Sequence, residues 1–238
     1  MERDYKLKTA ILLLPSRLIL FLIFQLSFAL LFSSLEYSIK FWIVYASATN
    51  IISISLLFYL FRTDGIQFFD LFRFDKATLK KDIMHFAGIT LICVPVVIFP
   101  NYFLSTSLWG DAIIPFDMMF KPLPLLLVYL LLFLFPITIA FAELATYFGY
   151  IMPVLISEFK KKWLAVLLPI LFLSIQHTTL PFIPDLKFIL YRTLMYLPFA
   201  SLIGIVLYYR PKLFPFFAIM HGLLDFATVI VLLKISDI

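Results

Sequence analysis

Four ionisable side chains lie within stretches of sequence that are otherwise apolar. Glu143 lies in PITIAFAELATYFGY, His177 in LLPILFLSIQHTTL, and His221 and Asp225 in LFPFFAIMHGLLDFATVIVLL. Ionisable groups at membrane depth are costly, and by default they mark a functional site. Carboxylate and imidazole groups in a cavity of low dielectric constant can activate water. These four residues are therefore candidate catalytic residues.

The composition indicates the class of protein that must position them. The chain has 238 residues, of which 63% are hydrophobic and only 14% charged, and its mean hydropathy is +1.06. A soluble domain of this size cannot bury so much apolar surface, so one integral-membrane domain over residues 1–238 is predicted. The single cysteine, Cys93, excludes a disulfide within the chain. The net charge of +5 does not indicate nucleic-acid binding, because the basic residues lie between apolar segments.

The apolar segments predict an all-α, polytopic transmembrane helix bundle. About seven segments approach the roughly 20 residues that cross a bilayer core, the fifth being somewhat short. They are roughly 10–32, 41–61, 83–104, 122–148, 163–180, 187–209 and 213–233. Connection 62–82 mixes Phe and Leu with charged residues, which predicts an amphipathic helix on the membrane surface. Connection 105–121 is predicted to be a longer loop on the other side, anchored by Trp109.

The distribution of Lys and Arg predicts the orientation in the plasma membrane. Basic residues gather before the first segment and in every second connection after it, whereas each remaining connection carries one Lys. By the positive-inside rule, the N-terminus and connections 62–82 and 157–162 are cytoplasmic and the C-terminus lies outside.

This topology also predicts that the four candidate residues converge. At about 1.5 Å per residue, their separations from the basic connections put all four roughly 14–25 Å from the cytoplasmic boundary. His221 and Asp225 are four residues apart and share one helix face. A single polar residue in a membrane helix is often only a hydrogen-bond partner between helices. Polar groups at matched depth on three segments favour one shared site.

The other unusual ionisable residues have simpler explanations. His85 lies beside Asp82 at the start of its segment and is expected at the membrane interface. Arg17 and Arg192 lie within or near apolar segments. Each can extend its guanidinium to the nearer membrane surface, cytoplasmic for Arg17 and outer for Arg192. Either can instead pair with an acid inside the bundle.

Three short motifs carry a resemblance to a known family. The stretch AELATYFGYIMP is similar to a Glu-Glu-x-x-x-Arg motif that continues into Gly-Tyr-Leu-x-Pro. Leu173 and His177 are similar to a Phe-x-x-x-His motif, and His221 and Asp225 match His-x-x-x-Asn/Asp. With these motifs in this order, residues 120–232 resemble the catalytic core of the CAAX protease and bacteriocin-processing family of intramembrane endopeptidases.

The resemblance implies a fold, an activity and a role for each residue. It implies a multi-helix bundle with a conical cavity open to the cytoplasm. It also implies hydrolysis of a peptide bond in a peptide or protein substrate, near the cytoplasmic face and without a cofactor. Glu143 would be the general base and His177 its partner in activating water. His221 and Asp225 would stabilise the oxyanion.

The first motif is incomplete, and this leaves two alternatives open. Leu144 and Phe148 stand where the family has its second Glu and its Arg. Losing both members of a buried ion pair can be nearly neutral, whereas losing one strands a charge. The chain can therefore be a catalytically inactive scaffold of the same fold that binds a membrane peptide or partner. It can also be a metal-dependent membrane protein, if the same four residues converge within about 2 Å of one point.

The topology can be tested by labelling. Single cysteines introduced into connections 62–82 or 157–162 should not react with a membrane-impermeant thiol reagent outside intact cells, because these connections hold most of the loop Lys and Arg. Cysteines in connection 105–121 should react and serve as the positive control. Efficient labelling of the basic connections would invert the predicted orientation.

Overall fold

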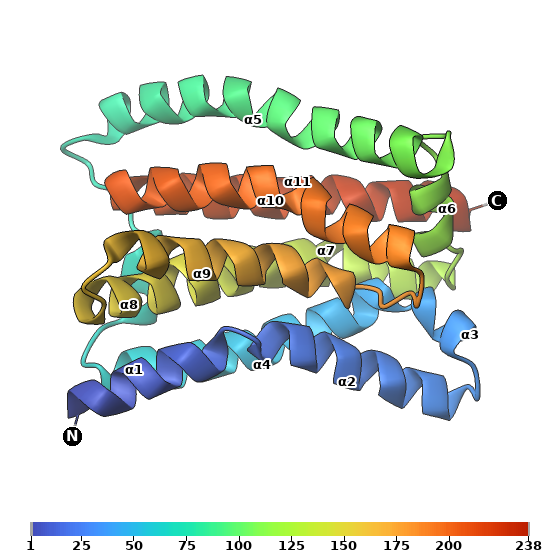
Figure 1. The fold of residues 1–238 in the computed structure, drawn as a ribbon, viewed down its shortest axis with the longest axis horizontal. Helices are drawn as coiled ribbons and strands as arrows, with labels where there is room; N and C mark the ends of the chain where they lie inside the picture. Colours follow the sequence, from blue (N-terminus) through green and yellow to red (C-terminus); the bar gives the residue numbers. More distant parts are fainter. Residues whose placement is uncertain (1, 238) are drawn as a thin grey trace.

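Almost the whole chain is helical. The computed structural model describes the backbone of residues 2–237 and the side chains of residues 5–237, and no β-strand occurs in that part. The α-helices are α1 (Glu2–Leu13), α2 (Ser16–Leu31), α3 (Leu35–Ile39), α4 (Trp42–Thr63), α5 (Leu79–Trp109), α6 (Ile114–Met119), α7 (Leu125–Leu144), α8 (Met152–Glu158), α9 (Lys162–Ile175), α10 (Leu186–Tyr209) and α11 (Phe214–Ser236) (Figure 1). A π-helix, Ala145–Ile151, joins α7 to α8, and 3-10 turns are formed by Phe68–Phe72, Gln176–Thr178 and Pro211–Leu213.

Several of these helices are long and apolar enough to cross a membrane, so the chain is an integral membrane protein. Five stretches within the described residues qualify alone: α4, α5, α7 with α8, α10, and α11. Helices α1 and α2 would form a sixth span, although they are bent by 45°. The apolar stretch Lys162–Thr178 is shorter. Every predicted apolar segment is thus largely helical, although the first, 10–32, is divided between α1 and α2. The all-α class is confirmed, while the number of seven spans stays a prediction.

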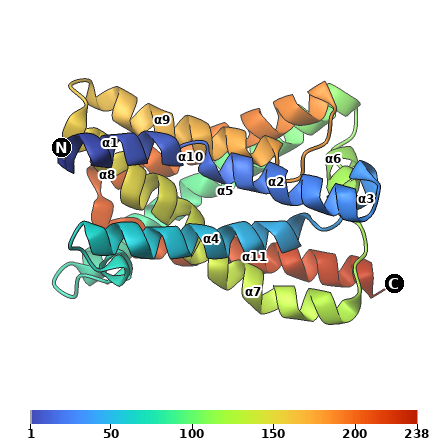
Figure 2. The same cartoon turned by 90° about the horizontal axis from the view of Figure 1, so that it is seen from below.

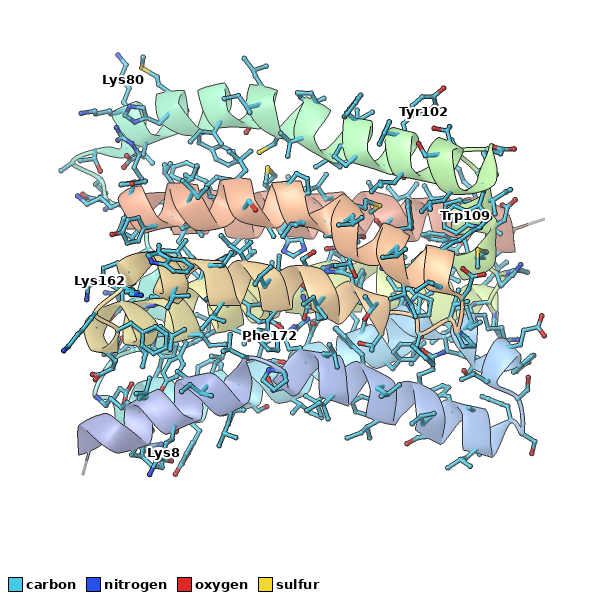
Figure 3. All side chains as sticks on the ribbon, in the orientation of Figure 1. Lys8, Lys80, Tyr102, Trp109, Lys162 and Phe172 are labelled. Carbon is cyan, nitrogen blue, oxygen red and sulfur yellow. The ribbon has the colours of Figure 1, made fainter. Side chains whose placement is uncertain are left out.

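The basic residues gather at one end of the bundle. The N-terminus and the connections that follow α4, α8 and α10 lie together at the left of Figure 1, and α3, α6 and the C-terminus lie at the right. Figure 2 shows the same division from below. In Figure 3, Lys8, Lys80 and Lys162 mark the first end, and Tyr102 and Trp109 lie toward the other. We call these the basic end and the opposite end.

The surface helix predicted over 62–82 is wrong. This connection forms only the short 3-10 turn Phe68–Phe72 before α5 begins at Leu79. Phe68 is buried and packs against Phe61 of α4, with ring centroids 5.7 Å apart. Burying these aromatic rings among the helices removes more apolar surface from water than lying on the membrane surface would. The connection therefore closes the basic end of the bundle.

Connection 105–121 is more ordered than the predicted loop. Helix α5 continues to Trp109 and ends at Gly110, whose φ of 80° is the left-handed conformation that terminates helices. The short helix α6 follows before α7 begins. This connection covers the opposite end of the bundle beside α10 and α11 (Figure 1).

The two departures from the first motif lie in the apolar interior. Leu144 ends α7, and Phe148 lies in the following π-helix. Both side chains are buried in the same hydrophobic cluster. A Cβ atom at Gly204 of α10 would lie 3.0 Å from the Phe148 ring, so α10 approaches this ring closely. An apolar pair at these positions needs no counter-charge here.

Helices α7 and α11 form the most extensive helix pair of the described fold. Their close approach depends on Gly222, where an added Cβ would lie 3.0 Å from the Pro136 carbonyl oxygen and 3.2 Å from the Ala140 Cβ. Gly222 follows His221 directly in the sequence. The absence of a side chain at this position therefore lets α11 bring His221 against α7, which carries Glu143.

A larger side chain at Gly222 should separate these helices. We expect Gly222→Val to lower the free energy of unfolding by about 1–3 kcal/mol, because it overpacks a close backbone contact. The matched control is Gly88→Val on α5, where an added Cβ meets no atom within 4 Å. Unfolding of the purified variants in detergent measures both effects. Equal stability of the two variants would contradict close packing at Gly222.

Candidate functional site

The break between α1 and α2 brings an arginine into the interior. Pro15 lacks a backbone N–H and interrupts the helix, and α2 begins at Ser16. The carbonyl oxygen of Leu14, at the break, accepts a hydrogen bond of 3.3 Å from the Tyr147 hydroxyl. Arg17 follows immediately and its side chain is fully buried. The expected extension of Arg17 to the membrane surface is therefore wrong.

Arg17 instead pairs with an acid inside the bundle, which was the alternative prediction. Its Nη2 atom lies 3.6 Å from Oε2 of Glu143. Nη2 also donates to Oδ1 of Asn50 at 2.9 Å, and Nη1 donates to the Ser53 hydroxyl at 3.1 Å. Nε donates to Oε1 of Gln176 at 3.1 Å. Every nitrogen of the buried guanidinium therefore has an acceptor, as burial of a charge requires.

The carboxylate of Glu143 contacts a different group on each oxygen. Gln176 donates from Nε2 to Oε2 at 2.7 Å, and its Oε1 accepts from Tyr147 at 3.2 Å and from Arg17. The other oxygen, Oε1, lies 3.4 Å from Nε2 of His221. Only 3% of Glu143 is exposed. The amide of Gln176 thus links the arginine to the carboxylate.

His221 lies between two carboxylates. Its Nε2 is 3.4 Å from Glu143 and 3.2 Å from Oδ2 of Asp225, one helical turn further along α11. Ionised carboxylates only accept hydrogen bonds, so Nε2 is the nitrogen that carries the proton facing them. The other nitrogen, Nδ1, is buried and has no partner among the described residues. The predicted pairing of His221 with Asp225 is present, and it extends to Glu143.

His177 lies in the 3-10 turn that follows α9. Its Nδ1 lies 2.8 Å from the carbonyl oxygen of Leu173 and must donate, because a carbonyl only accepts. In neutral imidazole this leaves Nε2 as an acceptor. The ring stacks on Tyr196 with centroids 3.6 Å apart. No direct hydrogen bond joins His177 to Glu143 in the described part of the chain, so the predicted pair can act together only through an intervening group.

All four candidate side chains line one cavity, as predicted. The cavity has a volume of about 660 Å³ and has Glu143, His177, His221 and Asp225 in its wall. Aromatic side chains from α4, from α6 and the residue that follows it, and from α10 also line the cavity: Trp42, Phe116, Phe120, Tyr191 and Tyr196.

The cavity lies toward the opposite end of the bundle. Its lining includes Ala112, Ile113 and Phe116 from the α5–α6 connection and α6, which lie at the right of Figure 1. No residue of connection 62–82 is in its wall. The lining therefore lies away from the basic end, and the cavity open to the cytoplasm, which the family resemblance implied, stays a prediction because the orientation in the membrane is itself one. The aromatic side chains of Phe68–Phe72 occupy the basic end instead.

Arg192 is buried in the cavity wall and does not extend to the outer surface, contrary to expectation. Its Nε donates to the carbonyl oxygen of His177 at 3.1 Å, and its Nη2 to that of Leu180 at 2.5 Å. Its Nη1 donates to the Tyr196 hydroxyl at 3.2 Å. These bonds hold the segment that carries His177 against α10. By contrast, His85 lies on the exposed surface near Arg210, 3.3 Å between Nδ1 and Nη1, in keeping with its expected interfacial place.

Sequence reasoning missed several polar residues of the site. Gln176 is adjacent to His177, and its amide was not considered. On α4, Ser47, Asn50 and Ser53 are all buried, and the last two hold Arg17. Their spacing of three residues places them on one helix face. A polar stripe on an otherwise apolar helix was the signal that could have found them.

The donor geometry does not fit the metal alternative. Within the described residues, no group of three or more His, Cys, Asp and Glu side chains is placed to hold a metal ion. Arg17 and Gln176 also occupy one oxygen of Glu143. A guanidinium so close to a carboxylate would repel a metal cation bound there.

Comparison of the chain with protein-family models, with curated proteins and with solved structures gives no match. The resemblance of residues 120–232 to CAAX proteases therefore stays a prediction from three short motifs. The catalytic roles of Glu143, His177, His221 and Asp225 likewise stay predictions, which the geometry of the cavity can support or weaken.

The pairing of Arg17 with Glu143 makes a stability prediction. Arg17→Met leaves the buried carboxylate without its cation and should cost about 3–5 kcal/mol of unfolding free energy. Adding Glu143→Gln should restore part of this, because the stranded charge is removed. Arg62→Met, at an exposed position on α4, is the control and should change little. SDS titration measures the unfolding free energy of the wild type, the two single variants and the double variant. If the double variant is no more stable than Arg17→Met, Arg17 does not act by neutralising Glu143.

Proposed function

We propose that this chain is an intramembrane endopeptidase of the CAAX protease type, in which Glu143 activates water. One observation carries the proposal: the buried carboxylate of Glu143 lies beside His221 at the polar base of a cavity, inside an otherwise apolar bundle. A carboxylate kept in such surroundings needs a reason, because apolar side chains of similar volume would cost less. Activation of water for attack on a peptide bond gives a role to all four candidate residues.

The side chains suggest how the reaction would proceed. A water molecule between Glu143 and the free Nε2 of His177 attacks the peptide carbonyl carbon, and Glu143 accepts the proton that the water loses. The Nε2–H of His221 lies between Glu143 and Asp225; once Glu143 has taken the proton from water, this N–H turns from Glu143 to the developing oxyanion. Asp225 orients the His221 ring. Glu143 then passes the proton to the leaving nitrogen as the C–N bond breaks, which gives a carboxylic acid and an amine; the acid's proton then passes to the amine, leaving a carboxylate and an ammonium group.

Arg17 has a distinct part in this scheme. The first motif lacks its arginine, since Phe148 occupies that position. Arg17 of α2 supplies a buried cation beside Glu143 from another part of the chain. The cation favours the ionised carboxylate, which is the form that can accept a proton. Arg17 is thus a positioning residue, and Gln176 couples it to the base.

A scaffold without activity is the second candidate. It is favoured by the limited access to Glu143, which is 3% exposed and has a neighbouring polar group at each carboxylate oxygen. The apolar pair Leu144 and Phe148 favours it as well. Such a protein would bind a membrane peptide or partner in the cavity without cutting it.

The proposed setting is the plasma membrane, with a peptide or protein as substrate or partner. We place the basic end in the cytoplasm because it carries most Lys and Arg, including the N-terminus. The C-terminus then lies outside.

Substitution of the base separates the two candidates. Glu143→Gln keeps the size of the side chain but removes its basicity, so turnover of a peptide-library substrate should fall by roughly 100-fold or more. His177→Ala should act similarly. Asp225→Asn should have a milder effect, because an amide can still hold the His221 ring. Chelators should leave turnover unchanged. The measurement is cleavage by purified protein, with folding checked by gel filtration in detergent.

Two results would overturn these assignments. A verified substrate that Glu143→Gln cuts as fast as the wild type would remove Glu143 from catalysis. Partner binding that survives the substitutions at 143, 177 and 225, in a protein that cuts nothing, would establish the scaffold.

A further inference from the structure

The cavity is closed toward the basic end by packed aromatic side chains. Phe72, from the 3-10 turn before α5, lies against Phe141 of α7 and Phe214 of α11, with ring centroids 4.7 Å and 5.4 Å apart. Leu71 fills the space that a side chain at Gly149 would need. Phe141 lies two residues before Glu143 on α7, so this packing reaches from the basic end to the depth of the carboxylate. A substrate on the basic side therefore meets a packed core before it meets the carboxylate.

The cavity wall toward the opposite end includes exposed apolar side chains. Ile113, in the α5–α6 connection, is 59% exposed and also lines the cavity. On α11, Leu224 is 46% exposed and lines the cavity as well. Within the described residues, α11 packs extensively on α7 but has few contacts with α5 or α10. The mouth of the cavity thus lies beside α11 and under the α5–α6 connection.

The depth of the site in the membrane also favours access from the opposite end. Half of a bilayer core is about 15 Å thick, and the four polar residues lie roughly 14–25 Å from the basic boundary by helix rise. They are therefore at the membrane centre or beyond it, nearer the opposite face. A volume of about 660 Å³ is within the range of sites for ligands of several hundred daltons. It can hold a few residues of an extended peptide.

We propose that the substrate is an apolar, membrane-anchored peptide segment that reaches Glu143 from the opposite end of the bundle, beside α11. The inference rests on the proposed peptidase function and adds its side of access and its substrate class. The aromatic walls formed by Trp42, Phe116 and Phe120 remove apolar side chains from water. The polar base is reserved for the peptide bond. With the basic end in the cytoplasm, the segment that is cut lies toward the outer face of the membrane.

Labelling of single cysteines in intact cells tests the side of access. In a Cys93→Ala background, Thr228→Cys places a thiol of similar size in the cavity wall. A membrane-impermeant thiosulfonate added outside should label it, because the cavity admits water from that side. Ala112→Cys, also in the wall, is a second variant in case Thr228→Cys folds poorly. Leu223→Cys is the matched control on α11: its side chain is exposed but outside the cavity, so lipid should shield it.

Two further controls define the ends. Ser107→Cys, exposed at the end of α5, should be labelled from outside, and Ser157→Cys, exposed at the end of α8, should be labelled only in inverted vesicles. The proposal is overturned if both cavity cysteines react only in inverted vesicles, or fail to react while Ser107→Cys is labelled.

Disulfide trapping tests the substrate class. A model peptide with one membrane anchor and one cysteine in its apolar juxtamembrane segment is expressed in both orientations. With an added mild oxidant that accepts the two electrons of the thiol pair, it should form a disulfide with Thr228→Cys only when that segment faces the opposite end. Trapping without cleavage by the wild type would keep the access route and remove the peptidase. Cleavage only of the peptide presented at the basic end would keep the peptidase and remove the access route.

Discussion

The burial of one carboxylate is the constraint on which the arrangement depends. Glu143 lies in the middle of an apolar bundle, where an uncompensated charge would cost several kcal/mol. The bundle supplies a guanidinium 3.6 Å away, an amide donor at 2.7 Å and an imidazole at 3.4 Å. These partners come from α2, the turn after α9, and α11. Four separate parts of the chain must therefore assemble before the charge is tolerated.

Local breaks in helical geometry make this assembly possible. Pro15 separates α1 from α2, and Arg17 points inward just after this break. The Tyr147 hydroxyl donates a hydrogen bond to the Leu14 carbonyl oxygen at the break. Tyr147 itself lies in the π-helix that follows α7. Insertions of this kind occur often at functional sites, because they redirect side chains without ending the helix. The irregular segments of this fold thus surround the carboxylate, while the regular helices provide apolar walls.

The helices and the four candidate residues could be predicted from the sequence, whereas the contacts between distant helices could not. Hydropathy predicted the helices because the length of an apolar segment is a local property of the sequence. Glu143, His177, His221 and Asp225 were predicted as neighbours because each is polar within an apolar segment and all four lie at a similar depth. Pairing of Arg17 with an acid inside the bundle remained one of two alternatives, and the sequence did not identify Glu143 as that acid, because the pair depends on how distant helices meet. The end of the bundle toward which the cavity lies could not be read from the sequence, since it depends on the tertiary packing of Phe68–Phe72.

The arginine that faces Glu143 lies far outside the motif-bearing stretch 120–232. An excised core with those boundaries would keep every motif and lose the cation beside Glu143, which would leave that carboxylate buried without its counter-charge. The two halves of the pair are also free to vary only together, because either change alone strands a charge. Among relatives of this chain, positions 17 and 143 should therefore covary, although they lie far apart in the sequence.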